Sequence, residues 1–491
     1  MRSTFGGIEI SKRSLFTHQA ALTTTGHNVA NANTRGYSRQ VVNMVASKPM
    51  ENIGLMRSTI PGQQGQGVEF DYIRRVREQF LDKQFYNENK GYGQWSVRRD
   101  TLEKLEAIIN EPSDTGMRQV MDNFWNSWQE LSKQPDNLEA RAVVKESALA
   151  LTDAFNHAAR QLSDLKSDLT DNIDVKVTEV NSLLQQVRNL NNEIYRIEGL
   201  GNDANDLRDQ RDVLMDDLSK IINVSVVEEP QGYVVTMGSV ELVNGSEVTE
   251  FDLELADSHF VVDGTGNLNS GELFGLYYSR NKLVTEYQNQ LDAMVTTMVT
   301  EVNATHQEGY TLKHPVENGG AFFVYQEVDP EDPTPPSFAE RMRVSTDITD
   351  DVENIAASGR TYTDEFGVVR VVKGDNEQAL ALAALRNQKF SFDGGGIEKI
   401  ILNGGTFDEF LRAVVGEIGV QSQEAIRQAS NQQILVEQVD SRRQSVSGVS
   451  LDEEMANMIK FQHAYNAAAR AMTSFDEMLD KVINGMGVVG R

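Results

Sequence analysis

The chain has 491 residues, of which 39% are hydrophobic, so it is long enough for about three domains and can bury a core. Its 46 basic and 73 acidic residues give a net charge of −27, which argues against a general nucleic-acid binder and against docking on anionic lipid. Cysteine is absent, which excludes disulfides, thiolate catalysis and metal sites with cysteine ligands.

The sequence predicts neither a signal peptide nor a membrane-spanning helix. Residues 1–32 lack the apolar stretch of a secretory signal peptide. The longest purely apolar run, Ala379–Leu385, is much shorter than the roughly 20 residues that cross a bilayer. We therefore expect no membrane insertion. If the protein leaves the cell, it must do so by a route other than an N-terminal signal peptide.

Residues 1–44 are expected to form an N-terminal assembly helix. Hydrophobic side chains recur every seven residues, as in one seam of a coiled coil: Ile8, Leu15, Leu22 and Val29. The alternate seam positions hold polar or small residues instead: Lys12, Gln19 and Gly26. Residues 45–75 follow as an extended or β-hairpin linker.

Residues 76–222 are expected to form a body of long helices. From Phe155 to Ile197, hydrophobic residues recur at steps of three or four, which places them on one helix face. At 1.5 Å per residue this stretch is roughly 63 Å long. That length is typical of a rod and not of a compact domain. Shorter helices are expected before it, over residues 80–110 and 117–133.

The middle of the chain has a different pattern. Residues 223–278 alternate β-branched and polar residues between glycines, which predicts an antiparallel β part. A helix over 279–308 is expected to return to the body. Residues 309–405 read as an outer part of strands and loops with one short helix, and residues 406–446 as a further long helix of the body.

Residues 447–491 are expected to form a C-terminal assembly helix. Its seam alternates steps of three and four residues and is rich in methionine, which suits an adaptable interface: Leu451, Met455, Met458, Tyr465, Ala469, Met472, Leu479, Ile483 and Met486. From periodicity alone, this seam fits equally a core helix of the folded chain and an interface with another subunit. A single chain cannot easily bury seams at both ends, so we expect a partner to complete them.

Together these elements predict a mainly α fold with a β-rich middle, in the α+β class. We expect an elongated multi-domain rod, in which a long helical bundle carries terminal coiled-coil helices and an inserted antiparallel β domain.

The sequence predicts no catalytic, cofactor or metal site. Residues 62–67 lack the lysine and following helix of a phosphate loop, and residues 263–267 read as a hairpin turn and not as a calcium loop. We expect four polar residues to lie in loops without a catalytic role: Asp263, His306, His314 and Asp393. The acidic run over residues 203–217, interrupted by Arg208 and Arg211, is interpreted as a solvated helix face.

Several motifs resemble those of a known family. The segment Asn28–Gln40 (NVANANTRGYSRQ) resembles the N-terminal signature of bacterial flagellar axial proteins, as do residues 65–68 (GQGV) and 73–75 (IRR). Residues 445–454 (SVSGVSLDEE), 461–470 (FQHAYNAAAR) and 206–212 (DLRDQRD) resemble, more narrowly, the flagellar hook-associated protein 1 (FlgK) family.

This resemblance implies a structural subunit without catalysis, located at the junction between flagellar hook and filament. It implies self-assembly in a helical polymer through the terminal helices. The implied partners are the hook protein, hook-associated protein 3 as the next protein toward the filament, and an export chaperone at the C-terminal segment. It also implies an extracellular position, reached unfolded through the flagellar export apparatus.

Two alternatives remain open at this point. The chain could be another flagellar axial subunit, such as the hook protein or hook-associated protein 3. It could also belong to a different class, as a secreted coiled-coil adhesin or an enzyme.

Overall fold

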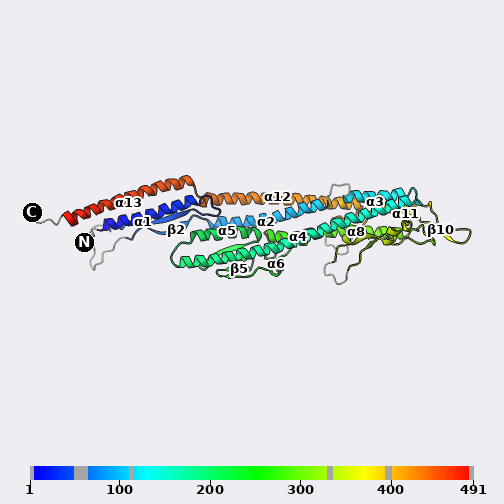
Figure 1. Cartoon of the computed structure of the whole chain (residues 1–491), viewed down its shortest axis with the longest axis horizontal. Coiled ribbons are helices and arrows are strands. Elements are labelled where there is room, and N and C mark those ends of the chain that lie inside the picture. Colours follow the sequence, from blue (N-terminus) through cyan, green and yellow to red (C-terminus); the bar gives the residue numbers. More distant parts are fainter. Residues whose placement is uncertain (1–4, 49–64, 110–115, 329–334, 393–400, 486–491) are drawn as a thin grey trace, which may run out of the picture.

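The computed structural model is a long rod with both chain termini at the same end (Figure 1). It describes residues 5–48, 65–109, 116–328, 335–392 and 401–485. Helices run along most of its length, and the strands form small antiparallel sheets at its side and ends. The predicted class, a mainly α rod with an inserted antiparallel part, is confirmed.

The end with the termini consists of two helices and one hairpin. Helix α1 (Gly6–Ala30) packs against α13 (Leu451–Gly485), and strands β1 (Gln40–Ala46) and β2 (Val68–Arg75) pair antiparallel beside α1. The expected assembly segment 1–44 therefore contains one helix, which ends at Ala30, and the start of the hairpin. The hairpin itself falls largely in the expected linker.

The body contains the longest helices, which lie side by side along the rod: α2 (Gln79–Ile109), α3 (Met117–Leu131), α4 (Leu138–Gly199), α5 (Asn205–Ile221) and α12 (Phe407–Ser447). Helix α4 has 62 residues, more than the sequence pattern indicated, because Asn137 caps its start well before Phe155. Thr406 and Glu409 form a capping box at the start of α12.

The central sheet has the strand order β3-β4-β5-β6, in which each strand pairs antiparallel with the next: β3 (Ser225–Glu229), β4 (Gly232–Met237), β5 (Val240–Asn244) and β6 (Glu247–Val248). It packs on α4. A short helix, α6 (Leu253–His259), follows the sheet. Then α7 (Glu272–Tyr278), a π-helical turn (Ser279–Val284) and α8 (Thr285–Gln307) run continuously back into the body.

The far end of the rod combines short elements around an aromatic core. It holds two further hairpins, formed by β7 (Phe323–Tyr325) with β8 (Met342–Val344) and by β9 (Thr361–Thr363) with β10 (Val369–Val371). The short helices are α9 (Phe338–Arg341), α10 (Thr346–Asp350) and α11 (Glu377–Ala384). The core joins α3 to α12 through stacked and tilted rings: Phe124, Trp125, Trp128, Phe322, Phe323 and Phe407. The short helix expected within 309–405 corresponds to α11, and the division of the chain into eight parts remains a prediction.

Candidate assembly interface

The two terminal helices pack antiparallel. Glu454, near the start of α13, contacts Asn28 near the end of α1; farther along, Phe461 lies beside His18, with 6.3 Å between ring centroids. Near the other end, the Phe475 ring lies directly against Gly7, where a Cβ would approach it to 2.5 Å. The chain therefore covers part of both seams with its own helices, without a second subunit.

The hairpin covers another face of α1. The Thr17 hydroxyl donates to the Arg13 carbonyl and, at 3.4 Å, to the Val68 carbonyl on β2. The Arg13 guanidinium lies 3.6 Å from Glu69 and also bonds Ser47. Helix α1 is thus held between α13 and the hairpin.

The predicted seam residues divide into two groups. Those partly buried lie mostly in the middle of the helix pair: Ile8, Leu15, Leu22, Val29, Met458, Tyr465, Ala469, Met472 and Leu479. Leu451, Met455 and Ile483 remain exposed, at 48%, 58% and 66% of their surface. Met486 lies outside the described residues.

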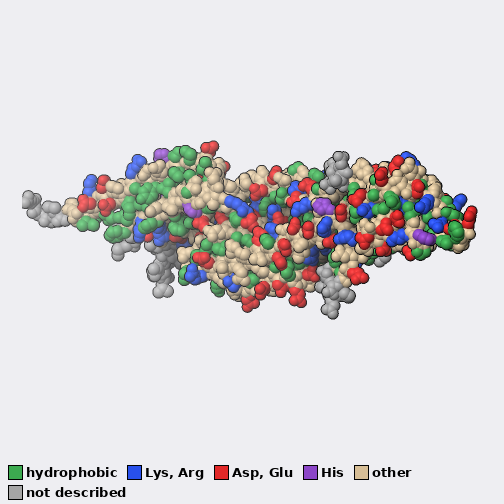
Figure 2. Space-filling view, turned by 45° about the vertical axis from the view of Figure 1, so that its right-hand side comes forward, with side chains coloured by type: hydrophobic (Ala, Val, Ile, Leu, Met, Phe, Trp, Pro, Cys, Tyr) green, Lys and Arg blue, Asp and Glu red, His purple; other side chains and the backbone are tan. Residues whose placement is uncertain are grey.

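Hydrophobic side chains gather on the surface of this end of the rod (Figure 2). Besides the exposed seam residues, the pair exposes apolar side chains that the heptad pattern did not include: Phe16, Ile459, Met478 and Val482. Contiguous apolar surface of this kind marks an interaction site in soluble proteins. The sequence carries a signal for three of these residues. A helix that packs by one face alone has polar residues on its other face, whereas Ile459, Met478 and Val482 place apolar residues there.

Three motifs that are far apart in the sequence meet where the helix pair joins the body. The Asn28 side chain donates to the Gln40 carbonyl and to Glu454 Oε2, both at 2.9 Å, and accepts from the Tyr37 hydroxyl and the Gln40 N–H. Asn28 and Glu454 are both buried. The Arg39 N–H donates to the Ser447 carbonyl, so the N-terminal motif bonds both sides of the turn between α12 and α13.

Helix α5 supplies the other side of this joint. Asp209 accepts from the Ser38 N–H and pairs with Arg75 at 2.7 Å, while Asp212 pairs with the same arginine at 2.7 Å. Burial raises the pKa of Asp209 despite the nearby Arg75. For Asp212, burial acts in the same direction, but Arg77 and Arg75 outweigh it and hold the pKa below its ordinary value.

A second set of pairs joins α5 to α2 and α12. Arg443 of α12 bonds Asp216 at 2.8 Å and lies 3.3 Å from Asp82 of α2. Arg77 forms a two-point contact with Asp82 at 2.8 and 2.9 Å. Burial raises the pKa of Asp216 to about 6, against the effect of Arg443. These ion pairs connect α5 to α2 and α12.

The interpretation of residues 203–217 as a solvated face is therefore wrong. Asp209, Arg211 and Asp212 are buried, and Arg211 lies over the Tyr233 ring with its guanidinium carbon 3.4 Å from the ring centroid. The Tyr233 hydroxyl donates to Asp212 at 2.6 Å. Alternating charges predict an exposed face when their partners are distant in the sequence, as they are here, on β2, β4 and the loop before β1. The motif resemblance of residues 206–212 was the one available signal.

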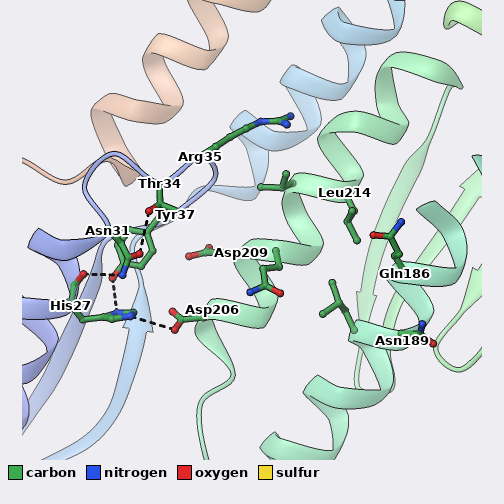
Figure 3. A pocket seen from close by; sticks show the side chains of 13 residues that line it. His27, Asn31, Thr34, Arg35, Tyr37, Gln186, Asn189, Asp206, Asp209 and Leu214 are labelled. Carbon is green, nitrogen blue, oxygen red and sulfur yellow. Dashed lines mark hydrogen bonds and ion pairs between the residues drawn. The ribbon is translucent and has the colours of Figure 1, made fainter. Parts of the chain in front are cut away.

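A cavity of about 620 Å³ lies beside this joint (Figure 3). His27, Asn31 and Tyr37 line it from the N-terminal motif, Asp206, Asp209 and Leu214 from α5, and Gln186 and Asn189 from α4. His27 lies 3.5 Å from Asp206 and 3.1 Å from the Tyr37 hydroxyl, so these polar side chains of the cavity wall contact one another.

Gly36 closes the turn of the N-terminal motif. Its φ is +78°, and a Cβ on it would lie 2.0 Å from the Val213 side chain on α5. Both the backbone conformation and the space require glycine here.

The four polar residues assigned to loops have different positions. Asp263 lies in a turn, where it accepts from the Thr265 N–H, and His314 lies in an irregular segment. Asp393 is outside the described residues. The expectation for His306 is wrong: it lies on α8 and is fully buried. Its apolar neighbours at helical spacing in α8 could have indicated a core position.

Across the described parts of the chain, no helix is long and apolar enough to cross a membrane, and no cluster of three or more His, Cys, Asp or Glu residues could hold a metal ion. Residues 62–64 of the glycine-rich segment 62–67 lie outside those parts.

Two protein-family models match parts of this chain. The model of the FlgK helical domain, described as flagellar hook-associated protein FlgK, matches residues 102–323. The model of the C-terminal part of the flagellar basal body rod FlgEFG protein matches residues 441–485, which include α13.

Relatives match over nearly the whole chain. Flagellar hook-associated protein 1 of Bacillus subtilis (strain 168) is 35% identical over 100% of both chains. Flagellar hook-associated protein 1 of Salmonella typhimurium is 24% identical and covers 95% of this chain and 97% of its own. The structure of the flagellar hook junction protein FlgK from Burkholderia pseudomallei has the same fold, with a TM-score of 0.59 at 15% identity, over 75% of this chain and 100% of that one. The chain thus belongs to the flagellar hook-associated protein 1 (FlgK) family.

Proposed function

We propose that the protein is a structural subunit of the bacterial flagellum that forms the junction between hook and filament, and that it assembles through α1 and α13. One observation carries this proposal. The end of the rod that holds both termini exposes apolar side chains on a helix pair that joins the body through hydrogen bonds of the N-terminal motif. Membership of the family supports polymeric assembly in the flagellum.

The physical argument concerns burial. Fully burying one Leu, Ile, Val, Phe or Met side chain contributes about 1.5–3 kcal/mol. Leu451, Met455 and Ile459 lie within three turns of α13 and are about half exposed. A monomer gains little from them, whereas a neighbour that covers them gains at every subunit of a polymer. A contact between two different faces repeats from copy to copy and produces a helical array.

The partners follow from the position. The hook protein lies on one side of the junction and hook-associated protein 3 on the other. An export chaperone covers the C-terminal segment before assembly, because an exposed apolar helix is prone to aggregation. The protein reaches the exterior through the flagellar export apparatus, binds no nucleic acid, inserts in no membrane and catalyses no reaction.

A deletion strain tests the proposal. Without this protein, hooks should be complete but bare, and filament subunits should be secreted into the medium. Expression of the full chain from a plasmid should restore attached filaments, and labelled protein should be found between hook and filament. Normal filaments on the deletion strain would overturn the proposal.

A further inference from the structure

Arg98 lies in an aromatic cage on the side of the rod. The guanidinium carbon of Arg98, on α2, is 3.6 Å from the Tyr278 ring centroid, 4.8 Å from that of Trp95 and 5.6 Å from that of Phe274. Among the described residues, its buried Nε has no hydrogen-bond partner, and no carboxylate lies within ion-pair distance. Arginines in such positions commonly pair with a carboxylate, which the planar fork matches.

A second cation lies at the same ring. Lys282 Nζ is 5.5 Å from the Tyr278 centroid, on the π-helical turn Ser279–Val284, and its side chain is exposed. It forms no ion pair with any described residue. Burial lowers the pKa of Arg98 to about 10, and Tyr278 offsets only part of this effect. A carboxylate at this place would be attracted by two cations, one of which is already desolvated.

An acidic edge lies at the same level of the rod. Residues 247–257 hold five acidic residues and no basic one, all exposed: Glu247, Glu250, Asp252, Glu254 and Asp257. Asp257 pairs with Arg280 at 3.5 Å, and Arg280 belongs to the same π-helical turn as Lys282. Figure 2 shows acidic side chains along the lower edge of the middle of the rod, where Figure 1 places α6.

We propose that Arg98 and Lys282 receive a carboxylate from the acidic edge (residues 247–257) of a neighbouring copy of this chain. The inference rests on the proposed function, because the neighbour exists only in the polymer. Copies with a net charge of −27 repel one another, so a basic site that faces an acidic edge favours one lateral alignment. Donor and acceptor lie at one level of the rod, as the Asp257–Arg280 pair shows, so a neighbour at the same level can present its acidic edge to this site.

Cysteine cross-linking tests this contact, since the chain has no cysteine of its own. Lys282→Cys is combined with Glu250→Cys, or in turn with Glu247→Cys or Glu254→Cys, and expressed in the deletion strain. All four positions are exposed, so each variant should keep the melting curve of the parent protein. Mild oxidation of isolated hooks with attached filaments should give dimers and higher multimers for at least one pair. Each single-cysteine variant, and Lys282→Cys with Val324→Cys at the far end of the rod, should remain monomeric.

The possible failures are distinct. Protein present between hook and filament without any cross-link in the three pairs would overturn the inference and leave the proposed function intact. Absence of the unsubstituted protein from the hook tip would overturn the proposed function itself, and with it the neighbour that the inference needs. Binding of inorganic phosphate to the isolated subunit that Lys282→Glu abolishes, without cross-links, would assign the site to a small anion and also contradict the inference.

Discussion

Asn28 and Glu454 are 426 positions apart in the chain, and their side chains meet at 2.9 Å in the buried joint between the terminal helices and the body. Asn28 also bonds Gln40 and Tyr37. Its side chain therefore connects the end of α1, the start of the hairpin and the start of α13.

We expect Glu454→Ala to loosen α13 without unfolding the body. The change removes one buried, charge-assisted hydrogen bond, which costs about 1.5–3 kcal/mol. Amide hydrogen exchange should become faster in residues 451–470 and stay unchanged in α4. Glu453→Ala is the matched control: Glu453 bonds Arg39 at 2.8 Å but is mostly exposed, so its loss should cost below about 1 kcal/mol. Equal effects of both changes would contradict a special role for the Asn28 contact.

A second prediction separates contacts within the chain from contacts between chains. Met455→Asp places a charge on the exposed surface of α13, whereas Met472→Asp places one on the face that is partly buried in the single chain. We expect Met455→Asp to keep the monomer's melting temperature and to prevent attachment of filaments, because an unpaired charge in an interface costs several kcal/mol.

Met472→Asp should make the helix pair more susceptible to proteolysis already in the isolated monomer. Limited proteolysis of both purified variants, together with electron microscopy of complemented cells, measures the two effects. Lys481→Asp, at an exposed polar position, serves as the control for added negative charge. If Met455→Asp cells carry normal filaments, the exposed face of α13 is not an assembly surface.

The long elements could be predicted from the sequence because their signals are local. The hydrophobic residues at helical spacing from Phe155 to Ile197 predicted the buried face of α4. The glycine-interrupted alternation of β-branched and polar residues after residue 223 indicated the central sheet. The joint could not be predicted in the same way. Asp212 and Arg75 carry the same local signature as solvated charges, and only the fold brings them to 2.7 Å. Periodicity likewise placed Met458 and Met455 on one seam, although the first is partly buried and the second is exposed.

Gly36 allows a prediction about the joint itself. Gly36→Ala combines a strained left-handed backbone with a clash against Val213, so we expect a loss of at least about 2 kcal/mol in the stability of the joint. Gly36→Ala with Val213→Ala should recover the part due to the clash and keep the part due to the backbone. Thermal melts of both variants, read beside Val213→Ala alone, separate the two contributions. Full recovery in the double variant would mean that the backbone conformation costs nothing.

The last prediction concerns His306, whose two ring nitrogens define one neutral form. Nδ1 lies 2.8 Å from the Gly320 carbonyl, to which it donates, and Nε2 accepts from the Ala356 N–H at 2.8 Å. Protonation would place a second N–H against that donor. Burial, which disfavours the charged imidazolium, lowers the pKa of His306 to about 4, from an ordinary value of 6.5.

Since the unfolded chain binds this proton below about pH 6.5 and the folded chain only below about pH 4, stability must rise with pH across that window. At one pKa unit per 1.36 kcal/mol, the loss on acidification approaches about 3 kcal/mol. In His306→Gln, whose amide can both donate and accept but does not titrate, this part of the pH dependence should vanish. Urea melts of both proteins at pH 4, 5, 6 and 7 measure the difference, in which the opposing effect of Asp216 cancels. Parallel curves for the two proteins would show that folding does not lower the pKa of His306 and that the assigned hydrogen bonds are wrong.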